Sequence, residues 1–153
     1  LNRESSHAEM LSETINSAVQ CFWDEDAGAY ASYLTETGRT HFCELTNALM
    51  LCCGAVPAER KERVQQALMS GTLIPVTLSH SIFKYDALLE SRANIPYVLN
   101  DIAEKWGHML MNGATTFWET IDGESAFGNA GSLCHGWSAI PAYVYFKIAR
   151  GNA

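Results

Sequence analysis

Apolar residues recur every three or four positions along most of this chain, which is the spacing of an amphipathic helix. The first stripe consists of Leu11, Ile15, Ala18, Val19 and Phe22. Ser6 and Glu9 stand before it with the spacing of a capping box, a signal for a helix start. The clearest stripe follows Asn94, a candidate N-cap, and consists of Ile95, Val98, Leu99, Ile102, Ala103 and Trp106. Each stretch is therefore predicted to be a helix with one buried face.

Glycine and proline positions delimit the other predicted helices. One helix is expected over residues 41–53, ended by Gly54. Its inward residues should be Phe42, Leu45, Leu49 and Cys52. Pro57 stands at the favoured first-turn position of the next helix, and a further helix is expected over residues 81–91. The last covers about residues 133–149, where Pro141 implies either a kink or a late start.

The pattern as a whole predicts an all-α fold. We expect six helices in roughly three antiparallel hairpins, forming a single helical domain over residues 1–153. At most one short β-hairpin is expected, near residues 30–37 or 115–119.

Composition narrows the class of partner. With 153 residues, 48% of them hydrophobic, the chain can bury a sizeable core in one domain. Its net charge of -7 argues against nucleic acid or an anionic membrane as a partner, because both repel an acidic surface. No apolar run approaches the roughly 20 residues of a membrane helix. Because the chain begins with Leu1, we expect it to be a processed product or a piece of a longer protein.

The five cysteines are an odd number and contain no C-x-x-C pair, so no structural metal site and no cofactor is predicted. Cys52 and Cys53 stand in an apolar stretch and are expected to be buried free thiols. Unpaired thiols favour the reducing cytoplasm.

Two polar loops near the end hold the candidate chemistry. The first contains Trp118, Glu119 and Asp122, and the second contains His135 and Trp137. Aromatic faces, carboxylates and an imidazole are the usual parts of a carbohydrate site. Each also has a structural explanation: Trp118 as a core residue, Glu119 as a cap of a helix N-terminus, Asp122 as a turn residue and His135 as a structural histidine. No G-x-S-x-G, P-loop, G-x-G-x-x-G or H-E-x-x-H motif occurs.

The stretches "KWGHMLMNGATTFWETIDG" and "GSLCHGWSAIPAY" resemble the C-terminal part of the catalytic domain of α-L-rhamnosidases, glycoside hydrolase family 78. "ELTNALMLCCGAVPAE" and "SIFKYDALLES" are similar to two further helices of that family. The resemblance extends from about Phe22 onward. It implies an (α/α) six-hairpin barrel, of which this chain supplies about the last half, and a carbohydrate substrate that ends in rhamnose.

The resemblance also implies an inverting glycosidase, in which one carboxyl group protonates the leaving oxygen and a second activates water. Glu119 matches the general base, and His135 matches a residue that contacts the sugar. Trp118, Trp137 and Asp122 are expected to complete the sugar site, with Trp118 fixing the direction of Glu119. The family's general acid belongs to a preceding segment that nothing here matches, so this chain alone is expected to be inactive. The missing half of the barrel is the expected partner, or a second copy covering the exposed face.

Two alternatives remain open at this point. The chain could belong to another six-hairpin glycosidase with a different sugar preference, because specificity lies in loops. It could instead be a non-catalytic helical module that binds sugars or proteins.

Overall fold

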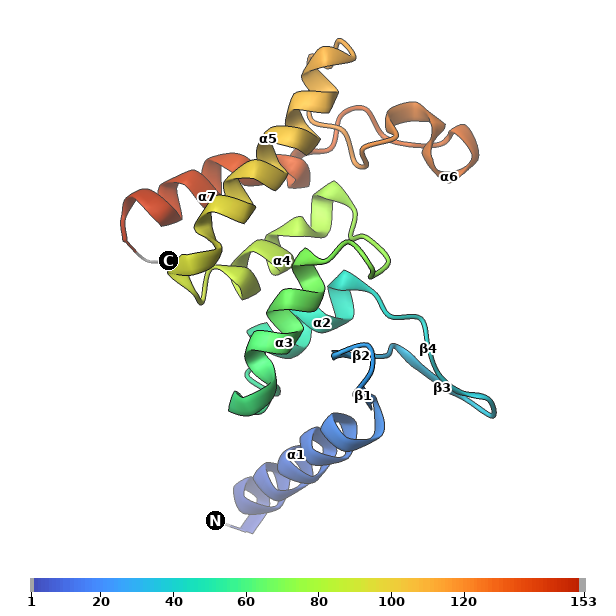
Figure 1. Ribbon diagram of the computed structural model, residues 1–153, viewed down its shortest axis with the longest axis vertical. Helices are drawn as coiled ribbons and strands as arrows, with labels where there is room; N and C mark the ends of the chain where they lie inside the picture. Colours follow the sequence, from blue (N-terminus) through green and yellow to red (C-terminus); the bar gives the residue numbers. More distant parts are fainter. Residues whose placement is uncertain (1, 152–153) are drawn as a thin grey trace. The chain divides into compact units, whose positions relative to one another are not determined.

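The computed structural model describes residues 2–151, with side chains from residue 6 onward. About 60% of it is helical, so the prediction of a mainly α-helical chain is confirmed. The contacts divide it into two compact units, Leu1–Ile74 and Pro75–Ala153, which are described separately (Figure 1). The predicted domain bounds also include residues 1, 152 and 153, which lie outside the described residues.

The first unit combines three helices with two small β-hairpins. Its elements are α1 (Asn2–Cys21), β1 (Trp23–Asp24), β2 (Ala29–Tyr30), β3 (Tyr33–Thr35), β4 (Gly38–Thr40), α2 (Glu44–Cys52) and α3 (Ala58–Met69). β1 pairs antiparallel with β2, and β3 pairs antiparallel with β4. The prediction of at most one hairpin is therefore wrong.

A contact distant in sequence stabilises the first hairpin. The side chain of Asn47 on α2 accepts a hydrogen bond from the Tyr30 N–H at 2.8 Å and donates to the Tyr30 carbonyl at 3.0 Å. Asn47 is buried and thereby pairs both main-chain groups of a strand residue. Alternation of apolar residues within residues 23–30 cannot reveal this partner.

Two predicted helix starts are corrected. α1 begins at Asn2, so Ser6 and Glu9 lie inside the helix and do not form a cap. α2 begins at Glu44 because the Sγ of Cys43 accepts the Thr46 N–H at the N-cap, and His41 has a left-handed φ of 60°. Gly54, with a φ of 70°, follows α2 as predicted.

The buried face of α2 also differs from the prediction. Glu44, Asn47, Ala48 and Leu51 are buried, whereas Leu49 and Cys52 are exposed. Cys53 is exposed as well, so the expectation of two buried thiols is wrong. On α1 the predicted stripe exists, but Leu11 is 61% exposed and only Val19 of the stripe is buried. A stripe of apolar residues thus predicts a surface suited to packing. Within the described residues, only the end of the α1 stripe, at Val19, is covered.

The second unit contains four α-helices and four short 3-10 turns. They are η1 (Leu78–His80), α4 (Ser81–Leu88), η2 (Arg92–Asn94), α5 (Ile95–Met111), η3 (Gly123–Ser125), α6 (Ala126–Asn129), η4 (Gly136–Ser138) and α7 (Ile140–Ala149). The stripe on α5 is confirmed in its centre, where Val98, Ile102 and Trp106 are buried. Pro141 lies in the first turn of α7, so the late start is the correct alternative.

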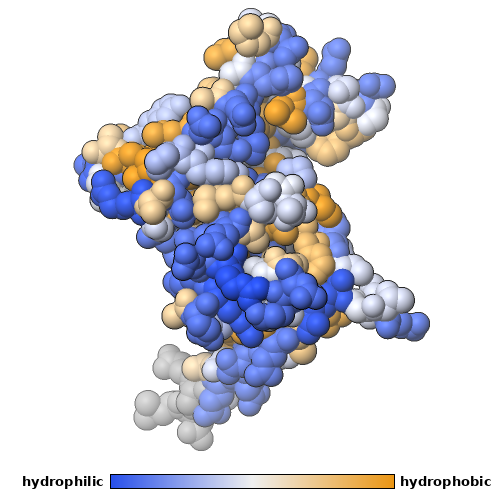
Figure 2. All heavy atoms as spheres, in the orientation of Figure 1, coloured by the Kyte–Doolittle hydropathy of each residue, from blue (hydrophilic) through white to orange (hydrophobic). Residues whose placement is uncertain are grey.

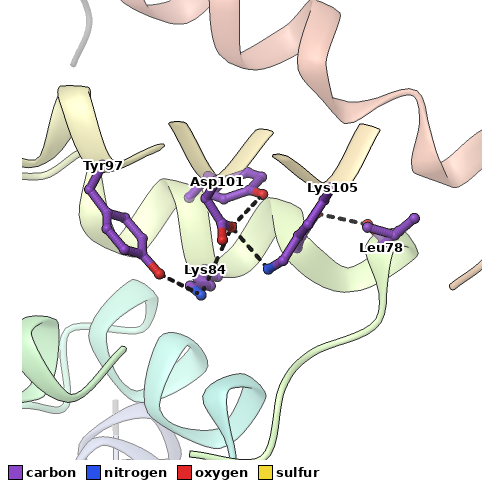
Figure 3. A network of polar contacts seen from close by, with 7 residues as sticks. Leu78, Lys84, Tyr97, Asp101 and Lys105 are labelled. Atoms are coloured by element: carbon purple, nitrogen blue, oxygen red, sulfur yellow. Dashed lines mark hydrogen bonds and ion pairs between the residues drawn. The ribbon is translucent and has the colours of Figure 1, made fainter. Parts of the chain in front are cut away.

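Charged groups join α4 to α5. Asp101 on α5 accepts hydrogen bonds from the Tyr85 hydroxyl at 2.8 Å and from the Lys105 ammonium at 2.9 Å (Figure 3). The Nζ of Lys84 stands 4.0 Å from the same carboxylate and donates to the Tyr97 hydroxyl at 3.2 Å. Lys84 is only 1% exposed, so its charge depends on these neighbours.

A second polar cluster joins α4 to α7. Asp86 accepts hydrogen bonds from the Tyr143 hydroxyl at 3.0 Å and from the Lys147 ammonium at 2.7 Å. Burial lowers the pKa of Lys147, but the hydrogen bond to Asp86, its negative charge and the Tyr143 hydroxyl together outweigh burial, so the net pKa is raised. With α5 and α7 both attached to α4, the two ends of the loop over residues 112–139 are held in place.

Large apolar side chains are exposed on the helices of the second unit as well as in its loops. Figure 2 shows apolar surface at the end of α5 and over α7. The exposed residues there include Leu110, Met111, Tyr145 and Phe146. Among the described residues, no helix is long and apolar enough to cross a membrane.

Candidate functional site

The two predicted loops lie against each other. The His135 N–H donates to the Phe117 carbonyl at 2.7 Å, and the Glu119 N–H donates to the Ser132 carbonyl at 2.9 Å. The Thr116 hydroxyl also donates to the Leu133 carbonyl. Residues 116–119 and 132–135 therefore form one hydrogen-bonded pair of segments, although neither is a regular strand. The tertiary structure thus places the two loops that hold the candidate residues next to each other.

Glu119 is half-buried and is held through its main chain and its side chain. One carboxylate oxygen accepts the Ser132 N–H at 3.4 Å, and the Glu119 carbonyl accepts the Ser79 N–H at the same distance. Ser132 lies in a loop, so the carboxylate does not cap a helix N-terminus. The remaining carboxylate oxygen is left for another partner, which a proton acceptor requires.

Close backbone approach at two glycines shapes the loop after Glu119. Gly123 has a φ of 58°, and a Cβ added there would stand 3.0 Å from the ring of Trp118. A Cβ added at Gly131 would overlap the Gly123 carbonyl oxygen. The aromatic ring thus packs on Gly123, and residues 123 and 131 touch through their backbones. Only glycine fits these two positions without a shift of the loop.

Trp118 and Asp122 line one open hollow of about 520 Å³. Residues 112–116 at the end of α5, together with Gly123, Glu124 and Leu133, complete most of its wall. Trp118 is half-buried, so it is neither a core residue nor a free surface residue. Asp122 is exposed and its carbonyl accepts the Ser125 N–H, which fits the predicted turn.

His135 and Trp137 form the other part of the candidate site. Their rings meet edge to face, with centroids 6.4 Å apart. The Trp137 side chain is 75% exposed, and His135 is half-buried. The adjoining turn is anchored to α5, because the Trp106 indole N–H donates to the Ser138 carbonyl at 2.9 Å. Neither ring belongs to the wall of the hollow beside Trp118.

The site also contains residues that the sequence did not single out. Ser132 binds the Glu119 N–H through its carbonyl and one Glu119 carboxylate oxygen through its N–H, and nothing in its local sequence predicts this role. In the sequence, Gly123 and Gly131 are two glycines of a glycine-rich stretch, and this pattern alone does not predict that they touch. In the part of the chain described, no three His, Cys, Asp or Glu residues gather as metal ligands.

No protein-family model matches this sequence, and no curated protein matches it. Solved structures do resemble it. The crystal structure of a GH78 family rhamnosidase of Bacillus sp. GL1 aligns with a TM-score of 0.72 and 30% identity, over 95% of this chain and 16% of that one. A rhamnosidase from Klebsiella oxytoca with rhamnose bound aligns with a TM-score of 0.74 and 20% identity, over 96% of this chain and 29% of that one.

The likeness to the Klebsiella protein shows a shared fold. Together with the Bacillus enzyme it confirms the resemblance to GH78 rhamnosidases that the motifs indicated. The chain spans well under two thirds of the length of either relative.

Proposed function

We propose that this chain is part of a glycoside hydrolase that releases terminal α-L-rhamnose from glycosides. The pairing of residues 116–119 with residues 132–135 carries the proposal, because it joins the segment of the predicted base to that of the predicted sugar contact. The 30% identity to a GH78 family rhamnosidase over 95% of this chain supports it.

In the proposed mechanism Glu119 is the general base of an inverting reaction. Its carboxylate accepts a proton from the water that attacks the anomeric carbon, while a carboxylic acid on the other face protonates the leaving oxygen. The two groups then stand roughly 6.5–9.5 Å apart, which leaves room for the water. The acid comes from another part of the complete enzyme, so this chain alone should hydrolyse poorly.

The other candidate residues are proposed to bind the sugar. Trp118, packed on Gly123, would offer its ring to the C–H face of a sugar in the adjoining hollow. Asp122 at the same hollow would accept sugar hydroxyls, and His135 and Trp137 would contact the sugar from the second segment. Sugar sites commonly combine aromatic faces with hydroxyl-binding carboxylates and imidazoles.

The proposed partner is the first half of an (α/α) six-hairpin barrel. Its helices would cover the apolar side chains that α5 and α7 leave exposed, because uncovered patches of this kind usually mark an interaction surface. Self-association through the same face is the alternative.

Glu119→Gln in the complete enzyme tests the function. The change keeps the size of the side chain but removes the proton acceptor, so kcat for an aryl α-L-rhamnoside should fall by about 10²–10⁴-fold with little change in KM or stability. Glu104→Gln, an exposed carboxylate on α5, is the matched control and should leave turnover unchanged.

The outcomes separate the alternatives. A complete enzyme that hydrolyses other aryl glycosides but no rhamnoside would indicate a different six-hairpin glycosidase. A protein that binds sugar with no turnover, in which Glu119→Gln changes nothing, would indicate a non-catalytic module.

A further inference from the structure

The η1 turn touches both loops of the candidate site. The Ser79 N–H donates to the Glu119 carbonyl at 3.4 Å, and the turn lies against η4, which begins directly after His135. Ser132 binds Glu119 from the other segment. The main chain of the proposed base is therefore held from two sides, and one of them is a turn that belongs to neither loop.

Three side chains at this turn form a closed cluster of polar groups. The Thr77 Oγ1 and the Ser79 Oγ lie 3.0 Å and 3.2 Å from the Nδ1 of His80, and 3.1 Å from each other. Ser79 is only 6% exposed, and Thr77 and His80 are half-buried. A movement of the Ser79 main chain would break these hydrogen bonds, so the cluster fixes the turn.

The hydrogen-bond pattern makes the Nδ1 of His80 an acceptor. Thr77 and Ser79 have one hydroxyl proton each, and among residues 6–151 the two hydroxyls have no side-chain partner outside the cluster. Both protons are paired when Thr77 donates to Ser79 and Ser79 donates to Nδ1. A proton on Nδ1 would leave one hydroxyl proton unpaired, which is unfavourable away from water. The cluster therefore depends on an unprotonated Nδ1.

We propose that Thr77, Ser79 and His80 are positioning residues for Glu119. The inference rests on the proposed function, in which Glu119 is the general base. The cluster fixes the Ser79 N–H, and that N–H fixes the main chain of Glu119. The three residues act through Glu119 and not by contact with the sugar. Such positioning matters because a displacement of about 1 Å can cost about 10²-fold in rate.

The test replaces His80 in the complete enzyme and measures hydrolysis of an aryl α-L-rhamnoside. His80→Leu removes the acceptor, so kcat per folded molecule should fall about 10- to 100-fold. KM should stay within about twofold, because the proposed sugar contacts of His135 and Trp137 remain. His7→Leu, which removes an exposed histidine from α1, is the control and should leave kcat unchanged.

Two amide variants show which nitrogen of His80 matters. His80→Asn places an amide oxygen where Nδ1 stands, so it should keep kcat within about threefold of the unchanged enzyme. His80→Gln places its amide oxygen one bond farther from the main chain and should be as slow as His80→Leu. A loss of bulk alone would affect both amide variants to a similar degree.

Ser79→Ala tests the cluster with a smaller change. It keeps the main-chain N–H that binds Glu119 and removes only the hydroxyl, so kcat should fall about 3- to 30-fold. Hydrogen exchange at the Ser79 amide should accelerate in this variant and in His80→Leu, because the turn is no longer fixed. This variant decides the matter even where His80→Leu does not fold.

A double change separates positioning from a merely structural role. With Glu119→Gln already present, His80→Leu should cause no further loss of kcat, since no base is left to position. Losses that multiply would overturn the inference, and so would an unchanged kcat in both His80→Leu and Ser79→Ala. A large loss in Glu119→Gln alone would then leave the proposed function standing. An unchanged kcat in Glu119→Gln would overturn both.

Discussion

Two regions of the second unit use the same kinds of polar and aromatic residue for different purposes. Between α4 and α5, Lys84, Asp101 and Lys105 are largely buried, and the Asp101 carboxylate lies close to both ammonium groups. In the loop over residues 112–139, Glu119 and Asp122 have few side-chain partners, and the aromatic ring of Trp137 faces solvent. The first region uses polar groups to attach helices, and the second keeps them available.

This difference explains how the loop over residues 112–139 can expose its side chains while its backbone stays ordered. Helices on both sides are attached through α4, and main-chain hydrogen bonds join residues 116–119 to residues 132–135. Its side chains are therefore free for a ligand while its backbone is already ordered. Preorganisation of this kind reduces the entropy lost on binding.

Among the variants that test this comparison, Asp101→Ala should change the free energy of unfolding most. Removing the carboxylate takes away the acceptor of the Tyr85 hydroxyl and of the Lys105 ammonium, as well as the negative charge 4.0 Å from the buried Lys84 ammonium, which should lower the free energy of unfolding by about 3–5 kcal/mol. Urea denaturation measures the change, and Glu104→Ala on the exposed side of α5 should cost under about 0.5 kcal/mol. The double change with Lys84→Met should recover part of the loss. Equal effects of Asp101→Ala and Glu104→Ala would contradict the interpretation.

Gly131→Ala should disturb the loop and spare the helices. The added Cβ overlaps the Gly123 carbonyl oxygen, so the two segments must separate, at about 1–3 kcal/mol. Hydrogen exchange should accelerate at the amides of Glu119 and His135. Gly136→Ala is the matched control, because a Cβ there meets no atom within 4 Å. Unchanged exchange in Gly131→Ala would show that this close contact does not order the site.

Trp118→Ala should have a smaller effect on stability. A fully buried tryptophan costs about 3–5 kcal/mol when truncated, but this ring is half-buried against Gly123. We expect a loss of about 1–2 kcal/mol in urea denaturation. Trp137→Ala, where the side chain is largely exposed, should lose under about 0.5 kcal/mol. A loss as large for Trp137 as for Trp118 would indicate packing outside the described contacts.

The smallest effect concerns the cluster that joins α4 to α7. The pKa of Lys147 is raised above 10.5, and burial with the Asp86 hydrogen bond raises the pKa of Tyr143 above 10.0. Both groups hold their protons more tightly when folded, so their stabilisation is complete at neutral pH and is lost as the pH rises through the folded pKa values. Comparing unfolding at pH 8 and pH 11, the chain should lose about 0.5–1 kcal/mol more than the Tyr143→Phe/Lys147→Met variant. An equal loss of stability in the chain and in the variant would show that Tyr143 and Lys147 do not cause the pH dependence.

The presence of helices was the most predictable feature of this fold. Which residues of each helix are buried was the least predictable. The stripe on α5 identified Val98, Ile102 and Trp106 as buried because its spacing matches one side of a long helix. On the short α2 the same reasoning selected Leu49 and Cys52, yet Glu44 and Asn47 are buried there. Asn47 is buried because it pairs the main chain of Tyr30, a partner 17 residues away.

The sequence by itself determined that the chain is mainly helical, that Pro141 either kinks the last helix or starts it late, and which two loops hold the candidate site residues. These features depend on local backbone preference and on residue type, which are readable from neighbours along the chain. Only the tertiary structure decided that Ser132 holds Glu119 and that Gly131 must lie against Gly123. Those facts arise from contacts between residues far apart in sequence, whose pairing depends on how the helices pack and not on any local pattern.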